Sequence, residues 1–301
     1  MMRAFIIANT SKPIVDAALQ KWLPAIKSRC EVVGVEIDGL YDLSKVEAEI
    51  MLVFGGDGTL LSAARRMSGK AIPMMGVNFG RLGFLASFQP EEFLEQFDAF
   101  LQGKLRSTSR MMLETSVVPE GRDCSPLDRA AVIAGRNFAA TALNDAVITA
   151  GAPFHMIELQ ISADVETAIR YFGDGAIVST PSGSTAYNVS AGGPIINPDV
   201  EALCITPICP HSLSFRPVVV SSNSTVLIVA TKVNEGTTLF CDGQASTKLV
   251  AGDRIIITRS PNDAILVENP QAREWRSLAE KLHWAISPKY NSFDGSTTKP
   301  V

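Results

Sequence analysis

The residues that most plainly suggest chemistry are Gly55-Gly56-Asp57-Gly58-Thr59, which follow an apolar run and precede a helix-like pattern. Such a glycine-rich loop lets backbone N–H groups approach an anion such as phosphate. Asp57 is unexpected there, because two like charges about 4 Å apart repel by about 1 kcal/mol in water and about 4 kcal/mol near a protein surface. Either the loop is a tight turn with a surface aspartate that contacts no phosphate, or Asp57 has a chemical role.

Phosphoryl transfer would give Asp57 such a role. That reaction depends on positioning and charge neutralisation, and an aspartate often accepts the proton of the attacking hydroxyl. Mg²⁺ would offset the repulsion between Asp57 and the phosphates. The loop is neither G-x-G-x-x-G nor a Walker A sequence, since no lysine follows it.

A second candidate site is the segment 174–195, with the sequence DGAIVSTPSGSTAYNVSAGGPI. Ser184-Thr185 could cap a short helix that runs from Tyr187 to Ser190. Backbone N–H groups, several hydroxyls and one aromatic ring would suit a sugar, an amide or a base, on which Tyr187 could stack. A glycine-serine linker is the alternative, but the embedded tyrosine and the flanking apolar runs disfavour it.

These residues resemble a known family. The GGDGT sequence after a strand resembles the shared motif of NAD kinases, diacylglycerol kinases and sphingosine kinases, and more distantly that of phosphofructokinases. Segment 174–195 resembles the NAD kinase signature, and lipid kinases do not carry so long a match. Four further stretches match in the same order: GVNFGRLGFLA (76–86), ALNDAVI (142–148), PHSLSFRPVV (210–219) and DGQ (242–244).

The resemblance implies an enzyme that phosphorylates the 2′-hydroxyl of the adenosine ribose of NAD, giving NADP. Asp57 would accept the proton, with Gly58 and Thr59 at the ribose and the donor phosphates. The other implied binding residues are Asn144 and Asp145 at the adenosine part, Asp174 on the nicotinamide side or across a subunit contact, Thr185, Ala186, Tyr187 and Ser190 at the adenine and amide pockets, and His155 and Gln244 near the dinucleotide.

Some of these residues have plainer alternatives. Asn144 and Asp145 alone could form a turn, His155 could be a core or rim histidine, and Gln244 could be a turn residue. Two positions also depart from the family pattern. Asp145 stands where glutamate is typical, which shortens the reach by one methylene, and Phe172 stands where many bacterial members have a polar or basic side chain. The second departure leaves the preference between NAD and NADH open.

Alternating strands and helices are expected to position the glycine-rich loop. Strand-like runs cover 3–8, 31–37, 50–54 and 72–77, and helical patterns cover 11–27, 59–67 (with Thr59 as the N-cap) and 90–102. This alternation predicts an α/β domain with a Rossmann-like parallel sheet, which we assign to residues 1–104.

After Gly103 strand-like runs dominate, at 112–118, 129–133, 156–162, 166–172, 225–233, 254–259 and 264–267. They predict a β-rich, β-sandwich-like domain of residues 105–268 that supplies most of the NAD site. A helix at 269–286 is expected to pack back on the first domain, and a polar tail follows at 287–301. The expected fold class is that of NAD kinases and diacylglycerol kinases, with the site in the cleft between the domains.

Composition limits the class of protein. The chain has 301 residues, of which 46% are hydrophobic and 19% charged, and a formal net charge of −4. These values disfavour a disordered protein and a general nucleic-acid binder. Five cysteines without a C-x-x-C pair argue against a disulfide framework and a zinc site, and for a reducing cytoplasm. No apolar run reaches about 18 residues, so no membrane span is expected.

The resemblance also implies Mg²⁺ as the partner of ATP. A tightly held protein metal is not expected, because the sequence shows no dedicated ligand cluster. It leaves polyphosphate open as a donor and implies a homodimer or homotetramer. Two rival functions are a lipid kinase that uses the same loop and a dinucleotide-binding regulator without catalysis. No basic amphipathic helix suited to a membrane surface is evident, and the loop is intact, so both rivals are less favoured.

Overall fold

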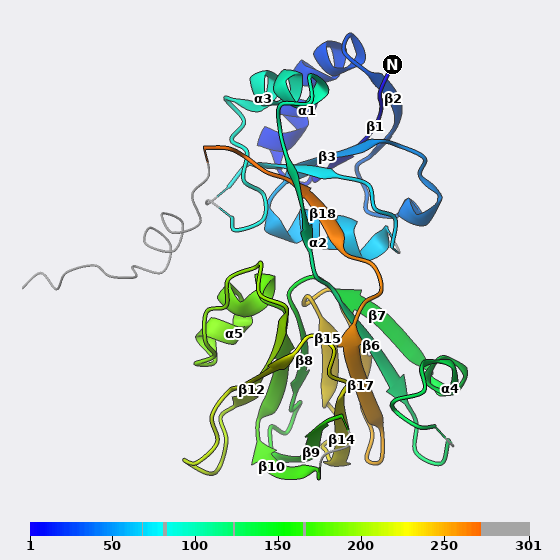
Figure 1. Ribbon diagram of the computed structural model, residues 1–301, viewed down its shortest axis with the longest axis vertical. Coiled ribbons are helices and arrows are strands. Elements are labelled where there is room, and N and C mark those ends of the chain that lie inside the picture. The colour runs from blue at the N-terminus through cyan, green and yellow to red at the C-terminus, as the bar shows by residue number, and fades with distance from the viewer. Residues whose placement is uncertain (68, 81–82, 123, 165–166, 272–301) are drawn as a thin grey trace, which may run out of the picture.

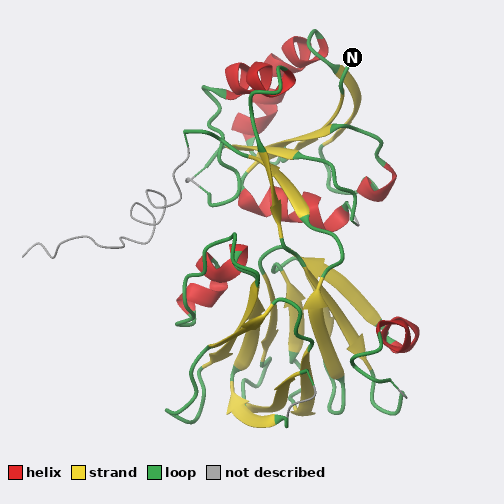
Figure 2. Cartoon of the chain, viewed as in Figure 1, coloured by secondary structure: helices red, strands yellow, loops and turns green. Residues whose placement is uncertain are grey.

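A computed structural model of the chain describes residues 1–67, 69–80, 83–122, 124–164 and 167–271. An α/β part lies above a part built almost entirely of strands (Figures 1 and 2). This arrangement confirms the predicted fold class. Beyond residue 271, the predicted helix at 269–286 and tail at 287–301 lie outside the described residues.

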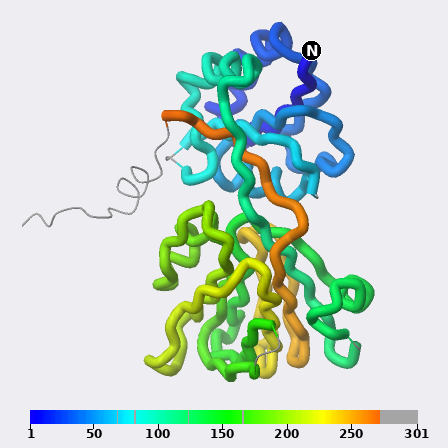
Figure 3. The backbone as a smooth tube through the Cα atoms, in the orientation of Figure 1, coloured from blue at the N-terminus to red at the C-terminus, as the bar shows by residue number. Residues whose placement is uncertain are grey.

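The upper sheet has the strand order β2-β1-β3-β4-β18-β5. Its first four strands run parallel, as the alternation predicts: β1 (Arg3–Ala8), β2 (Glu31–Glu36), β3 (Ile50–Gly55) and β4 (Met74–Asn78). β18 (Ala264–Val267) adds parallel to β4, and β5 (Ser107–Arg110) adds antiparallel to β18. Up to residue 271 the chain therefore crosses between the two parts twice, and the crossings lie side by side (Figure 3).

Helices cover both faces of this sheet. α1 (Pro13–Lys27) and α3 (Phe93–Leu101) pack on one face, and α2 (Asp57–Arg66) packs on the other. Successive strand residues point to opposite faces of the sheet. Ala4 and Ile6 of β1 therefore pack in the apolar core under α1 and α3, while Phe5 and Ile7 pack in the core under α2. α2 lies between the sheet and the β-rich part (Figure 1), which places the glycine-rich loop at the boundary between them.

α2 begins earlier than the sequence predicts. Thr59 is not its N-cap, because Gly56 holds that position and Asp57 is the first helical residue. The side chain of Thr59 packs instead against Gly55, where an added Cβ would overlap the threonine hydroxyl. Gly55 therefore allows the end of β3 and the first turn of α2 to lie in close contact.

Two six-stranded antiparallel sheets form the lower part, in the orders β10-β9-β14-β17-β6-β7 and β13-β12-β11-β8-β15-β16. Their strands are β6 (Leu113–Val118), β7 (Phe138–Ala142), β8 (Asp145–Thr149), β9 (Ile157–Ala163), β10 (Ile169–Gly173), β11 (Gly175–Ser179), β12 (Ala202–Ile208), β13 (Val218–Ser221), β14 (Val226–Lys232), β15 (Thr238–Cys241), β16 (Ala245–Lys248) and β17 (Arg254–Arg259). Leu159 and Ile228 of one sheet share a core with Val178 and Leu203 of the other, so the sheets pack face to face.

One predicted strand is a helix. Residues 129–133 belong to α4 (Arg129–Gly135), because the side chain of Asp128 accepts hydrogen bonds from the backbone N–H groups of Ala130 and Ala131. The short helix predicted from Tyr187 to Ser190 is present as α5. Its N-cap is Ala186 rather than Ser184 or Thr185, which lie in the preceding 3-10 helix, η2 (Ser182–Thr185).

Candidate active site

Asp57 holds a distant turn through its carboxylate. Oδ2 accepts a hydrogen bond from the backbone N–H of Phe84 at 2.7 Å, and Oδ1 accepts from Leu85 at 3.3 Å and Ala86 at 2.9 Å. Gly83 makes this approach possible, since an added Cβ there would overlap Oδ1. A carboxylate has about four lone-pair sites, so three donors fix its orientation and leave about one site for a further partner.

Gly58 and Thr59 continue the first turn of α2 beside Asp57. The first N–H groups of a helix have no partner within the helix, and the helix dipole adds partial positive charge there. An anion such as a phosphate is stabilised at such an end. The loop thus combines a place for phosphate with a carboxylate of fixed orientation.

A cavity of about 410 Å³ lies in the β-rich part and contains four of the predicted site residues: Asn144, Asp145, Ala186 and Tyr187. Asp145, Val147 and Thr149 alternate along β8, so one face of this strand forms a wall. Tyr187 and Phe240 contribute aromatic rings. Apolar walls, two rings and a few polar groups are typical of a site for a small organic ligand.

Asp242 organises the turn that carries Asn144 and Asp145. Its carboxylate accepts hydrogen bonds from the backbone N–H groups of Leu143 at 2.8 Å, Asn144 at 2.7 Å and Asp145 at 3.2 Å. Asp242 also lines the cavity. Our sequence reasoning missed this residue, although the DGQ motif that contains it was available as a signal.

Two neighbouring carboxyl groups of the cavity, those of Asp145 and Asp242, have raised pKa values. Asp145 is only 5% exposed. Burial, and next the charge of Asp242, raise its pKa to about 7. Burial likewise raises the pKa of Asp242, although the three backbone N–H groups and the Arg65 charge act in the opposite direction. Near neutral pH this pair therefore retains part of a proton, which lowers the cost of burying it.

Gln244 connects the cavity turn to the glycine-rich loop. Its Nε2 donates to the carbonyl oxygen of Gly58 at 2.8 Å, and its Oε1 accepts from Nη2 of Arg65 at 3.2 Å. Gln244 was predicted to lie near the dinucleotide; it contacts α2 and is not among the cavity-lining residues. The contact brings the loop of one part directly against the turn of the other.

Asp174 is exposed and lies outside the cavity lining. It precedes β11, whose last residue, Ser179, pairs with Asp145, so the two acids are roughly 16 Å apart along the strand at about 3.3 Å per residue. Thr149 lines the cavity and pairs with Gly175, the neighbour of Asp174. Asp174 is thus a sequence neighbour of the end of this wall and not part of the cavity lining.

The remaining predicted residues are less directly connected to the cavity. His155 is exposed, and its carbonyl oxygen accepts a hydrogen bond from Nδ2 of Asn234 at 2.9 Å. Thr185 and Ser190 flank Ala186 and Tyr187 but are outside the cavity lining. Sequence reasoning also missed the wall residues Val147, Thr149 and Phe240, which look like ordinary strand residues.

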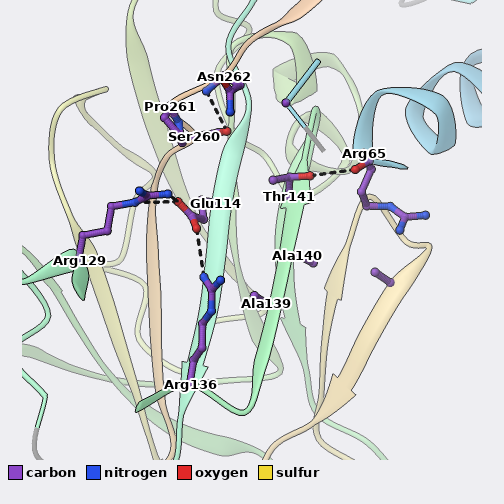
Figure 4. A pocket seen from close by; sticks show the side chains of 12 residues that line it. Arg65, Glu114, Arg129, Arg136, Ala139, Ala140, Thr141, Ser260, Pro261 and Asn262 are labelled. Carbon is purple, nitrogen blue, oxygen red and sulfur yellow. Dashed lines mark hydrogen bonds and ion pairs between the residues drawn. The ribbon is translucent and has the colours of Figure 1, made fainter. Parts of the chain in front are cut away.

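A second cavity of about 390 Å³ lies along β7 and contains none of the predicted site residues. Arg65 lines one end, and an ion-pair cluster of Glu114 with Arg129 and Arg136 lines the other (Figure 4). Across the described ranges, no group of three or more His, Cys, Asp or Glu side chains is arranged to hold a metal ion. None of the helices in these ranges is long and apolar enough to cross a membrane.

The fold and the site together define a two-domain phosphotransferase, with a carboxylate in a phosphate-type loop and a cavity for an organic molecule on the other domain. Comparisons with known proteins agree. The family model of the ATP-NAD kinase N-terminal domain matches residues 3–105, and that of the ATP-NAD kinase C-terminal domain matches residues 143–269.

Individual relatives give the same result. An NAD kinase of Rhodopirellula baltica is 36% identical over 94% of this chain and 87% of its own. The crystal structure of an Archaeoglobus fulgidus NAD kinase with ATP is similar at a TM-score of 0.70 and 26% identity, covering 94% of this chain and 99% of that one. A yeast NADH kinase with bound NADH shares the fold at a TM-score of 0.78 and 22% identity, covering 96% and 90% of the two chains.

The chain therefore belongs to the NAD kinase family. This confirms the resemblance seen in the sequence, and nothing in the comparisons favours a lipid kinase or a regulator.

Proposed function

We propose that the chain transfers the γ-phosphoryl group of ATP to the 2′-hydroxyl of the adenosine ribose of NAD, and that Asp57 accepts the hydroxyl proton. The observation that carries this assignment is the hydrogen bond from Gln244 to the carbonyl oxygen of Gly58. It joins the Asp57 loop to the turn that lines the cavity. An adenosine held at Asn144 and Asp145 would therefore present its ribose to Asp57.

In the proposed transfer step, each bond that forms and breaks and the proton that is released can be assigned to ATP, the ribose hydroxyl or Asp57. The hydroxyl oxygen bonds to the γ-phosphorus, the bond from this phosphorus to the β,γ-bridging oxygen breaks, and the hydroxyl proton passes to Asp57. A carboxylate is a weak base toward an alcohol, but it suffices when the proton moves after the new bond has begun to form. The three backbone donors keep Asp57 oriented, and among the described residues they leave about one lone-pair site for the hydroxyl.

The cavity suits the rest of the dinucleotide. Tyr187 and Phe240 offer faces for stacking, and Asn144 and Asp145 offer an amide and an acceptor for adenosine. The β8 wall continues toward Thr149 and Asp174, the direction in which we assign the nicotinamide half. Thr185, Ser190 and His155 remain proposed contacts of the same ligand.

We propose that Mg²⁺ arrives with ATP and is held mainly by the substrate phosphates and water, as is common for this ion. Among the described residues no group of three or more His, Cys, Asp or Glu side chains forms a dedicated metal site. When bound, the ion neutralises charge on the phosphates. We also propose a reducing, cytoplasmic location, supported by five unpaired cysteines, and a homo-oligomer, which light scattering would test.

Asp57→Asn tests the proposal, because it keeps the size and removes the base. Its amide accepts fewer of the backbone N–H groups of residues 84–86 than the carboxylate does, so the midpoint of thermal unfolding is measured beside kcat to show whether that turn stays in place. We expect kcat for NADP formation from NAD, ATP and Mg²⁺ to fall by about 10²–10⁴-fold, as for loss of a general base. The dissociation constant for NAD should change little, since the binding groups are on the other domain. Calorimetric titration of NAD and a coupled assay for NADP measure the two quantities.

Three further arms make the test specific. Diacylglycerol in place of NAD should give no phosphatidate, a chelator should abolish turnover, and polyphosphate in place of ATP reports the donor. Near-normal turnover of the Asn variant would remove Asp57 from the acceptor role. NAD binding by the wild-type protein without any NADP would contradict the proposed reaction as a whole.

A further inference from the structure

Arg65 is the residue of α2 that connects the phosphate loop to the second domain. It lies eight residues after Asp57, roughly 12 Å along the helix at about 1.5 Å per residue. Its backbone carbonyl accepts a hydrogen bond from the hydroxyl of Thr141 on β7 at 3.5 Å. Its side chain extends away from the ion-pair cluster of Glu114, Arg129 and Arg136 (Figure 4).

One connection runs from Arg65 back to the loop. Nη2 of Arg65 donates to Oε1 of Gln244, which orients the amide, and Nε2 of Gln244 then donates to the carbonyl oxygen of Gly58. Gly58 is the residue next to Asp57. Both ends of α2 are thus bound by one side chain of the second domain, so a rotation of Gln244 would release the loop.

The same contact also lies beside the cavity. Gln244, which Arg65 holds, follows Asp242 by two residues in the turn between β15 and β16, and Asp242 lines the cavity through its carboxylate. That carboxylate accepts the backbone N–H groups of Leu143, Asn144 and Asp145. Arg65 thus acts on the turn that presents Asn144 and Asp145 to the ligand.

A purely structural role explains Arg65 poorly. Its Nε is buried without a hydrogen-bond partner among the described residues, and a buried donor in that state destabilises the fold. The neighbouring Arg66 differs: its guanidinium pairs with Glu36 and the carbonyl oxygen of Tyr41, both in the first domain. The two adjacent arginines therefore differ in their contacts. Arg66 pairs within the first domain, whereas Arg65 contacts Gln244 of the second domain.

We propose that Arg65 is a positioning residue for the transfer step, which aligns the glycine-rich loop with the NAD cavity through Gln244 and Asp242. The inference rests on the proposed function for the identity of the reaction. It assigns Arg65 no contact with substrate. A misplacement of the reacting groups by about 1 Å can cost about 10²-fold in rate. The relay of contacts that fixes the Gly58 carbonyl group and the turn at Asn144 and Asp145 can therefore have a large effect on kcat.

A double-mutant cycle of Arg65→Met and Gln244→Ala tests the relay. Each single change should lower kcat by about 10-fold or more and change the dissociation constant for NAD by less than about 3-fold. Because both act through one contact, the double variant should be about as slow as the slower single variant rather than slower by the product of the two effects. The readouts are kcat, and NAD binding by calorimetry.

Arg66→Met is the matched control on the same helix. It removes a guanidinium of the same size that stays within the first domain, so it should lower the midpoint of thermal unfolding while kcat stays within about 2-fold of wild type. An equal loss of kcat in this control, or multiplicative effects in the cycle, would overturn the positioning role.

Gln244 is exposed, so Gln244→Ala should fold even if Arg65→Met does not. The test can then be made with the Gln244 variant alone. Normal kcat in Gln244→Ala alone would then reject the relay. The outcome is independent of Asp57: normal turnover of Asp57→Asn would reject the proton acceptor but leave the coupling between Arg65 and Gln244 unaffected.

Discussion

Asp57 in the first domain and Asp242 in the second bind backbone in the same way. Each carboxylate accepts N–H groups from three consecutive residues, 84–86 for Asp57 and 143–145 for Asp242. Their surroundings differ. Asp57 starts a helix next to Gly58, where the helix N-terminus favours an anion, whereas Asp242 lies beside a second acid in a cavity where burial raises the pKa of both.

Hydrogen bonding alone therefore does not identify a proton acceptor. Both carboxylates orient a turn, and both would be ranked alike by their contacts. Asp57 and Asp242 differ in whether the phosphoryl donor and the acceptor hydroxyl can come within reach of the remaining lone pair of the carboxylate. We therefore assign chemistry to Asp57 and binding geometry to Asp242, and three predictions test this division.

The largest effect is expected from Gly83→Ala. The added methyl group would overlap Oδ1 of Asp57, so the carboxylate must turn or the loop must move. We expect kcat to fall by about 10²-fold, as for a comparable misplacement of a reacting group, with NAD binding nearly unchanged. Gly103→Ala, at an exposed position without neighbours within 4 Å but with φ of +69°, is a control for a strained glycine substitution; if it slowed turnover equally, the Asp57 contact would not be the cause.

Asp242→Asn should act on binding and stability instead. Its amide cannot accept all three backbone N–H groups, and leaving buried donors unpaired costs about 1–3 kcal/mol. We expect a loss of that size in the free energy of unfolding by urea, and NAD affinity weaker by about 10-fold because the turn at Asn144 and Asp145 loosens. A variant that binds NAD normally but turns over slowly would contradict the division between the two carboxylates.

Asp145→Asn should give the smallest effect, seen as a change with pH. The pKa of Asp145 is raised from an ordinary 3.8 to about 7, so the folded chain holds this proton more tightly than the unfolded chain. Stability from this group is therefore lost as pH rises from about 4 to about 7. Between pH 6.5 and 7.5 the wild type should lose under about 1 kcal/mol relative to the asparagine variant; parallel stability curves would show that Asp145 does not titrate there.

Sequence reasoning reached the elements with a strong local signal. The alternation of strands and helices up to residue 104 predicted the parallel sheet, and the glycine loop predicted the start of α2 to within two residues. It failed at 129–133, where the cap provided by Asp128 outweighs a strand-like run. It also misplaced Thr59, because a threonine that packs on Gly55 looks the same in sequence as one that caps a helix.

The site was recoverable only in part, for a physical reason. Asn144, Asp145, Ala186 and Tyr187 belong to motifs with unusual composition, and these four line the cavity. Asp242 and Arg65 gain their importance from contacts across roughly a hundred or more positions of sequence, and no local pattern marks such contacts. Gln244 was predicted as a residue near the dinucleotide, which stays a prediction, but its contacts with Gly58 and Arg65 could not be read from the sequence.

The return of β18 to the first sheet has a consequence for synthesis. β18 (Ala264–Val267) stands between β4 and β5, so β5 has no partner in that sheet until the last described strand has left the ribosome. The first domain cannot complete itself as the chain emerges, and the β-rich domain, which lies wholly between residues 113 and 259, is made in full before then. Completion of the first domain therefore waits for synthesis of the β-rich domain, and truncation at residue 104 would leave the edge of β4 open to pairing with another chain.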